Sequence, residues 1–347
     1  MKSLAIIIPI WNERETIIKD CFDAYSKIKY DGEYKVYIAI NYQDKKVIDI
    51  CNKYLPSNFI LNISKNKSHL KASNINAVLP KIKEDVIAIF DVDNVPLGNY
   101  CNACVNALND EVGLSVGRGY FPNRNKNILT KYEEFVQIDS IQCIENLYKL
   151  VNNGVMPITN AGYFMERKTW NKLILNENTV TEDIDLSIQL DEQQIKGVIV
   201  NEYVTIPLAE GFRNSFNQSV RWITGAFTFP KHHQNAFEKN TNMAVLLAPN
   251  FLLYMTTVYK IFLALFLLIS LPFYFSIPII LSLLWYDLEN QYWQFMRVHG
   301  CITKYGKPLS RKIAYFVGLM EYINLIIAIK AYYKYKFKPL DWYLTKK

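Results

Sequence analysis

The chain has 347 residues, of which 50% are hydrophobic and 20% charged, and a formal net charge of +7. This length can bury one large core or two smaller ones. The modest positive charge gathers in the last third beside apolar runs and no nucleic-acid motif is present, which argues against a nucleic-acid partner. Six cysteines without framework spacing argue against a disulfide-stabilised secreted protein.

The N-terminal part of the chain has the pattern of an α/β domain. Nearly continuous apolar runs at residues 4–10, 34–40 and 85–93 predict buried strands of a parallel sheet. Helical spacing follows the first strand at residues 15–28, and a further helix is predicted at residues 72–82. This order indicates a doubly wound domain, whose ligands bind beyond the carboxyl ends of the strands.

The central part is mixed, with strands predicted at residues 113–121 and 197–204 and a helix at residues 128–151. No Gly/Ser linker interrupts it. We therefore expect one catalytic domain over residues 1–240, with "WNERE", "NYQD" and "DVDN" at the ends of its strands.

Long apolar runs follow this domain. Residues 245–286 are long enough for two membrane spans with a turn at Pro272, although Pro278 interrupts the second half. We expect a transmembrane hairpin over residues 241–290 and a basic C-terminal region over residues 291–347, with an interfacial or third membrane helix. Basic flanks place the catalytic domain on the cytoplasmic side of a multi-pass protein of the cell membrane.

Three groups of polar residues can carry chemistry. In "FDVD", Asp91 and Asp93 follow a buried strand; such a pair is either solvated or holds a hard cation such as Mg2+, which completes its shell with substrate phosphates. "TED" predicts a helix start capped by Thr181, which is also a rigid platform for a general base. "QSVRW" places an Arg beside a Trp on a helix, where they act either as a surface anchor or at a site.

In this order, D-x-D, T-E-D and Q-x-x-R-W followed by membrane segments resemble the membrane-bound, often processive family 2 glycosyltransferases. These include the hyaluronan, chitin, cellulose and poly-N-acetylglucosamine synthases. Further matches are "PIWNE", "KASNINA", "NAGYFMERKTW" and the ending "WYLTKK". The resemblance covers about Leu4 to Phe227, with weaker support in the tail.

The resemblance implies a GT-A type nucleotide-sugar-binding domain with C-terminal membrane helices. It implies that Asp183 accepts the acceptor's proton, with Glu182 and Arg221 also catalytic, and that Asp93 holds Mg2+ or Mn2+ against the donor diphosphate. The implied donor-binding residues are Glu13, Asp44, Lys71, Asp91, Asp93, Gln218 and Arg221. The implied acceptor-binding residues are Trp222, Gly162 and Tyr163.

The chain departs from the family in "AINYQDKK", where only Asp44 remains of a base-reading aspartate set and Asn41 replaces a carboxylate. A UDP-sugar is therefore the family default rather than an established donor. The membrane part is also small, so either a second copy or a partner membrane subunit completes a channel, or the product stays attached to a lipid.

Three functions remain open: extension of a β-linked glycan, single-sugar transfer to a polyprenyl phosphate or other lipid, and an inactive nucleotide-sugar-binding scaffold. The intact Asp93, Asp183 and Arg221 argue against the scaffold.

Overall fold

The computed structural model of the chain describes residues 1–66, 70–135, 162–228, 259–301 and 311–338, together with residues 68, 137, 158, 232 and 233. The strands are β1 (Leu4–Ile10), β2 (Tyr34–Asn41), β3 (Phe59–Ser64), β4 (Val86–Ile89), β5 (Val112–Tyr120), β6 (Tyr163–Glu166) and β7 (Lys196–Thr205). The helices are α1 (Glu15–Tyr25), α2 (Lys45–Tyr54), α3 (Lys71–Asn76), α4 (Tyr100–Ala107), α6 (Arg167–Trp170), α7 (Glu182–Glu192), α8 (Phe212–Ala226), α12 (Phe273–Cys301) and α13 (Arg311–Phe337), with a 3-10 turn η1 (Leu79–Lys81).

The strands form one seven-stranded sheet in the order β3-β2-β1-β4-β6-β5-β7. Strands β1 to β4 are parallel, and β5 is parallel to β7, but β6 is antiparallel to both of its neighbours. The expected α/β domain is confirmed, whereas the sheet is mixed rather than fully parallel. The reason lies at Gly162, whose N–H bonds the carbonyl of Ile89 at 2.7 Å. Because β6 thus begins beside the end of β4, β6 runs antiparallel to β4.

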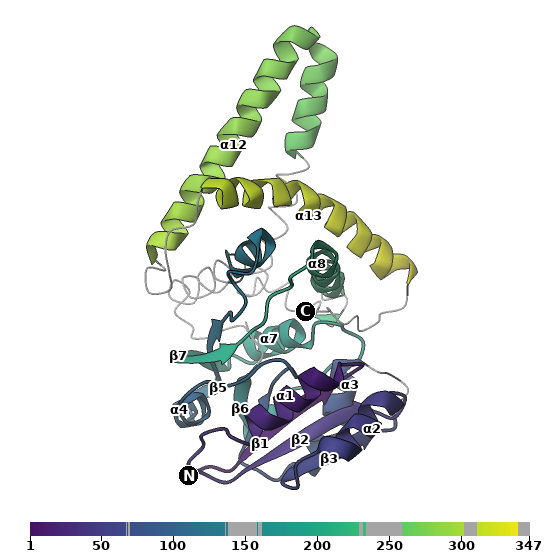
Figure 1. The fold of residues 1–347 in the computed structure, drawn as a ribbon, viewed down its shortest axis with the longest axis vertical. Coiled ribbons are helices and arrows are strands. Elements are labelled where there is room, and N and C mark those ends of the chain that lie inside the picture. The colour runs from purple at the N-terminus through teal and green to yellow at the C-terminus, as the bar shows by residue number, and fades with distance from the viewer. Residues whose placement is uncertain are drawn as a thin grey trace.

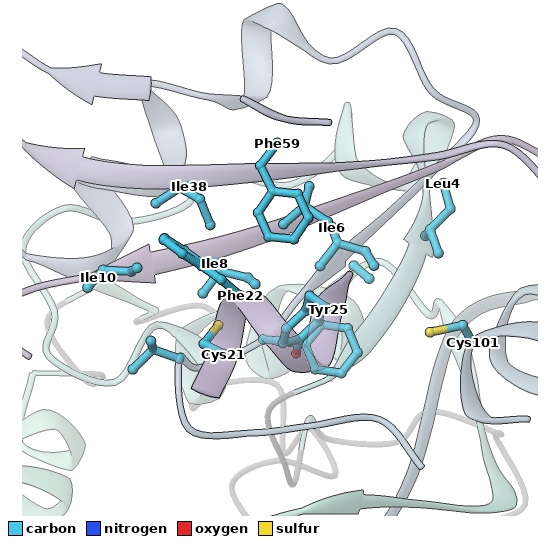
Figure 2. Close-up of a cluster of buried hydrophobic side chains, with 14 of the residues drawn as sticks. Leu4, Ile6, Ile8, Ile10, Cys21, Phe22, Tyr25, Ile38, Phe59 and Cys101 are labelled. Atoms are coloured by element: carbon cyan, nitrogen blue, oxygen red, sulfur yellow. The ribbon is translucent and has the colours of Figure 1, made fainter. Parts of the chain in front are cut away.

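The sheet is covered on both faces, so each strand contributes to two cores. All seven residues of β1 are buried. Figure 2 shows one face, where Ile6 and Ile8 lie among the α1 side chains Phe22 and Tyr25. The alternate β1 residue Ile7 packs with residues of α3 and α7 in the second core. This double burial explains the unbroken apolar sequence of β1 and fixes the strand ends that carry the polar loops.

Sequence patterns predicted the central strands better than the sheet edge. The limits predicted for β1 are confirmed, but α2 and β3 were not predicted, because β3 is an edge strand with Ile60 and Ile63 exposed. The helix expected at residues 72–82 is broken into α3 and η1, because Pro80 cannot continue the hydrogen-bond ladder. Of the helix expected at residues 128–151, residues 128–135 are helical, residue 137 also, and the remainder lies outside the described residues.

Near the C-terminus, helical residues 259–270 and α12 form a hairpin that projects away from the sheet (Figure 1). The turn predicted at Pro272 is confirmed, but Pro278 lies inside α12 rather than interrupting it. Much of the first predicted span, residues 245–258, lies outside the described residues. No helix in the described part of the chain is both long and apolar enough to cross a membrane.

Helix α13 lies across the base of this hairpin and above α8 (Figure 1). Its Ile327 and Ala331 share a small core with Val220 of α8. The ring of Phe227, just after α8, stacks on Tyr335 with centroids 6.0 Å apart. Helix α13 is therefore packed onto the helix that carries the "QSVRW" residues.

Candidate functional site

The polar loops after β1 and β2 are tied together by Asp44. Its carboxylate accepts a hydrogen bond from the N–H of Val47 at 3.2 Å, capping α2, and another from the N–H of Asn12. Asn12 has a φ of 52°, a conformation that Asn tolerates better than most residues. Asp44, expected to bind the donor, therefore serves first to hold the loop that presents Glu13.

Asn41 stands where the family pattern has a carboxylate, and its contacts explain the change. Its side-chain amide donates to the carbonyl oxygens of Asn66 at 3.0 Å and Ser68 at 2.9 Å. A carboxylate could not donate these hydrogen bonds. Asn41 thus fixes the loop that follows β3, and with it the approach to α3.

Lys71, the first residue of α3, joins the two acidic motifs. Its ammonium lies 2.8 Å from Asp91 Oδ1 and 2.5 Å from Glu182 Oε1. Burial alone would lower the pKa of Lys71, but Asp91 and Glu182 outweigh it and raise this pKa well above its usual value. Two segments far apart in the sequence are therefore held by one cation.

Asp183 lies in the first turn of α7, where its Oδ1 accepts a hydrogen bond from the N–H of Ile184 at 2.9 Å. Burial and then the charge of Glu182 raise its pKa to about 6, against the opposing influence of Lys71 and Arg221. At neutral pH this carboxylate is ionised yet more basic than an ordinary Asp, which suits a general base.

Arg221 of α8 is close enough to lower the pKa of Asp183 through its charge. Its buried Nε has no hydrogen-bond partner among the described residues. Gln218 lies one turn before Arg221 and Trp222 follows Arg221 directly, and both are also partly buried. The three expected residues of the third motif therefore lie on adjoining parts of the α8 surface, and Arg221 faces the acidic cluster.

Thr181 does not cap α7 as expected. Thr181 occupies the N-cap position, but its side chain makes no capping hydrogen bond to α7. Its hydroxyl instead lies 3.3 Å from the hydroxyl of Thr179. The reason is the close approach of α8: a Cβ added to Gly225 would meet Thr181 Oγ1 at 2.1 Å. A glycine therefore allows the two motif helices to touch.

Two of the three residues expected on the acceptor side, Gly162 and Tyr163, are buried behind this cluster. Gly162 has a φ of +85°, and a Cβ there would meet the ring of Phe90 at 2.7 Å, so its role in this structure is close packing. Tyr163 is 1% exposed, and its hydroxyl has no hydrogen-bond partner among the described residues. Burial raises the pKa of Tyr163, and the charges of Lys71, Glu182 and Asp183 act on it, so the phenol borders the cluster.

Asp93 and Glu13 lie on another side of the strand ends. Burial raises the pKa of the Cys21 thiol, and the charges of Asp93 and Glu13 raise it further, which places both carboxylates near α1. Among the described residues, no three His, Cys, Asp or Glu side chains come together as a metal cage. The strand-end carboxylate of Asp93 nevertheless fits a hard divalent cation that takes its other ligands from water and phosphate, since Mg2+ can bind through a single protein carboxylate.

Residues 86–294 match the family model described as "Glycosyl transferase family group 2". A beta-monoglucosyldiacylglycerol synthase from Synechocystis sp. is 24% identical over 65% of this chain and 48% of its own length. A UDP-forming cellulose synthase catalytic subunit from Xanthomonas axonopodis is 23% identical over 64% of this chain and 31% of its own length. These matches thus take in about half of the first relative and about a third of the second.

Among solved structures, a mannosyltransferase from Pyrobaculum calidifontis, in complex with GDP-Man and Mn2+, has a similar fold. The TM-score is 0.55 at 12% sequence identity, over 96% of this chain and 87% of that chain. The GT-A-like α/β fold expected from the sequence is thereby confirmed.

Proposed function

The chain belongs to glycosyl transferase family group 2, and we propose that it transfers a sugar from a nucleoside-diphosphate donor to a glycan acceptor at a membrane, forming a β-linked product. The observation that carries this proposal is the cluster in which Lys71 joins Asp91 to Glu182, beside Asp183 and Arg221. A UDP-sugar is the proposed donor, as the name of the related cellulose synthase subunit suggests.

In the proposed reaction, Asp183 accepts the proton of the acceptor hydroxyl while its oxygen bonds the anomeric carbon of the donor sugar. The bond from that carbon to the diphosphate oxygen breaks, and the nucleoside diphosphate leaves with the bond electrons. Attack from the opposite side inverts the configuration. Arg221, whose Nε has no described partner, is suited to bind the departing phosphates because its guanidinium can donate two parallel hydrogen bonds.

The proposed donor site is lined by Glu13, Lys71, Asp91 and Gln218, with Asp44 fixing the Glu13 loop. Asp93 would hold Mg2+ or Mn2+. When bound, such an ion supplies positive charge that stabilises the leaving diphosphate. Trp222 would offer its ring to the acceptor sugar, with Tyr163 and Gly162 shaping the site behind it.

We also propose that the protein is attached to the cell membrane, with its catalytic part on the cytoplasmic side. The hairpin exposes large apolar side chains, among them Phe262, Ile269 and Phe273, which are 66%, 86% and 69% exposed. Along α13, Ile326, Ile329, Tyr333 and Phe337 are exposed at helical spacing, and the exposed Lys330 and Lys336 flank them. Such a stripe suits the interface of an anionic bilayer.

A second candidate is transfer of a single sugar to a lipid acceptor. One relative, which is named a beta-monoglucosyldiacylglycerol synthase, favours this candidate. For glycan extension, we propose that a second copy or a partner membrane subunit helps to enclose the growing chain, because exposed polar groups in lipid are costly.

The test is incubation of the detergent-solubilised protein and Mn2+ with labelled nucleotide sugars, in parallel with Asp183→Asn as the matched control. Products are separated by size and by extraction into organic solvent. A large, solvent-insoluble product supports glycan extension, and a small extractable one supports the lipid acceptor. If the wild-type protein turns over no donor, or if Asp183→Asn keeps full activity, the proposed mechanism is wrong.

A further inference from the structure

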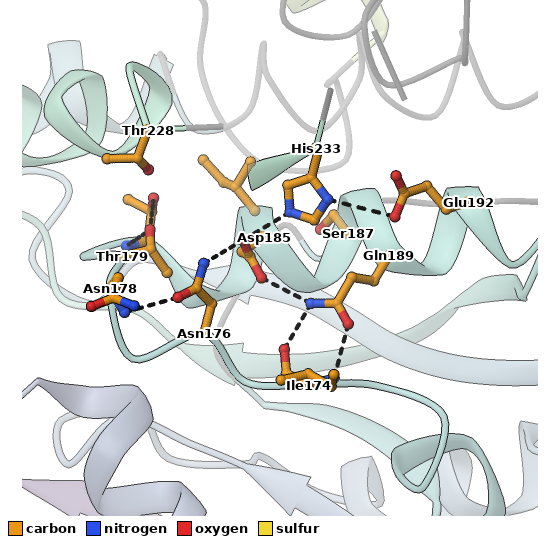
Figure 3. Close-up of polar contacts among 12 residues, drawn as sticks. Ile174, Asn176, Asn178, Thr179, Asp185, Ser187, Gln189, Glu192, Thr228 and His233 are labelled. Carbon is orange, nitrogen blue, oxygen red and sulfur yellow. Dashed lines mark hydrogen bonds and ion pairs between the residues drawn. The ribbon is translucent and has the colours of Figure 1, made fainter. Parts of the chain in front are cut away.

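The third acid of the "TEDID" stretch, Asp185, faces away from the cluster of Lys71 and is 1% exposed. Figure 3 shows it at the centre of a polar network. Its Oδ2 accepts a hydrogen bond from Gln189 at 2.8 Å, and its Oδ1 accepts one from Asn176 at 3.4 Å. Gln189 in turn exchanges two hydrogen bonds with the backbone of Ile174. Asp185 thus binds the segment that precedes α7.

The network also contains His233, which lies beyond the end of α8. Its Nε2 is 2.9 Å from Asp185 Oδ1, and its Nδ1 is 3.5 Å from Glu192 Oε2. Asp185 and Glu192 are seven residues apart and lie on one side of α7. His233 is 8% exposed, so the imidazole is held between two carboxylates and largely away from water.

His233 contacts α7 at Asp185, in the first turn of the helix, and at Glu192, its last residue. Gly225 of α8 meets α7 at a different place, at Thr181 before its first turn. Contacts at both places restrict the orientation of α7 more than either contact alone. Because α7 carries Asp183, its orientation sets the position of the proposed base relative to the guanidinium of Arg221 on α8.

We propose that His233 and Asp185 are positioning residues, which hold α7 against the segment after α8 and thereby align Asp183 with Arg221. This inference rests on the proposed function. Neither residue is assigned contact with the donor or acceptor. Their effect is on the geometry of the residues that have such contact.

The charge of His233 decides how strong this attachment is. Protonated imidazole donates from both nitrogens, to Asp185 and to Glu192, whereas neutral imidazole turns a lone pair toward one carboxylate. Glu177 and His232 line the same pocket, of about 770 Å3, and are the other titratable groups there. Burial alone would lower the pKa of His233, but Asp185 and then Glu192 raise it above its usual 6.5.

The test uses the full-length protein in detergent with its active donor and compares His233→Gln with the matched control His232→Gln. In the wild type, we expect kcat to decline as the pH rises through the pKa of His233. We expect His233→Gln to lose about tenfold in kcat at pH 6.5, with the KM for the donor unchanged, and to lack the alkaline decline. His232→Gln keeps both the rate and the decline.

A second measurement follows the histidines directly. Selective 15N labelling of the four histidines allows the His233 ring to be titrated by NMR, with His233→Gln used for assignment. The proposal requires a pKa above 6.5 in the wild type and a lower one in Asp185→Asn. It is overturned if His233→Gln keeps the wild-type rate and decline, or if His233 titrates below 6.5. If His233→Gln does not fold, the Asp185→Asn comparison decides, whereas a wild type without any turnover removes the proposed function itself.

Discussion

Replacement of Lys71 by Met tests whether one cation holds the two acidic motifs together. The variant keeps the length of the side chain but leaves Glu182, whose side chain is 7% exposed, without the ammonium 2.5 Å away. Removing one partner of a buried ion pair costs about 3–5 kcal/mol. Lys71 is 14% exposed and Asp91 42% exposed, so solvent screens the second contact and the lower end of that range applies.

We therefore expect Lys71→Met to lose about 3 kcal/mol of unfolding free energy at pH 8, which lowers the Tm by roughly 5–10 °C. Because the pKa of Lys71 is raised, its contribution in the wild type is fully present below its unfolded value of 10.5 and disappears only when the pH rises through the folded pKa. It is therefore constant between pH 5 and pH 8.

The assay is thermal unfolding in detergent at both pH values, followed by intrinsic fluorescence. Lys71→Arg keeps the positive charge and serves as the control; it should lose much less. Equal Tm values for Lys71→Met and the wild type at pH 8 would refute the reasoning, since the carboxylates would then not depend on this cation.

Three further outcomes are expected. Because burial and Glu182 raise the pKa of Asp183 to about 6, kcat/KM should be half-maximal near pH 6 and fall about tenfold per pH unit below it. The Asp183→Asn variant should bind the donor without transferring sugar. Gly225→Ala should cost about 1–3 kcal/mol of stability, because the added methyl group would clash with Thr181, and it should reduce activity. Adding Thr181→Ala should recover part of the stability, which thermal melting of the single and double variants would show. Ile329→Glu combined with Phe337→Glu should weaken binding to anionic vesicles in a flotation assay without changing the Tm; undiminished binding would exclude α13 as a membrane contact.

The parts of the fold that could be predicted are those in which burial produces a recognisable pattern of apolar residues in the sequence. Strand β1 is buried along its whole length, so its limits follow from its apolar run. The antiparallel course of β6 could not be predicted, because it depends on where Gly162 meets the end of β4 in space. Strand β3 was missed for a different reason, since an edge strand buries only part of its side chains.

The candidate site shows the same division. The motif residues Asp91, Glu182 and Asp183 were identified as a set, and the structure brings them together around Lys71. Local rules failed where a distant segment competes: Thr181 has the residue type of a helix cap, but α8 packs on it. The partners of Asp185 were missed because His233 is 48 residues away and its spacing follows no metal-ligand pattern.

The packing of α13 on α8 also has a consequence for biosynthesis. Helix α8 leaves the ribosome well before α13 is synthesised. Until then Val220 lacks the side chains of Ile327 and Ala331 that bury it in the folded protein. The first cluster of α13, in which Met320 covers Leu129 and Tyr132, forms equally late. The nascent chain therefore exposes an apolar surface until α13 emerges, and a chain cut off before Arg311 would keep that surface exposed. Truncated chains that end at the catalytic motifs should accordingly aggregate, and this packing should be completed only after α13 has been translated.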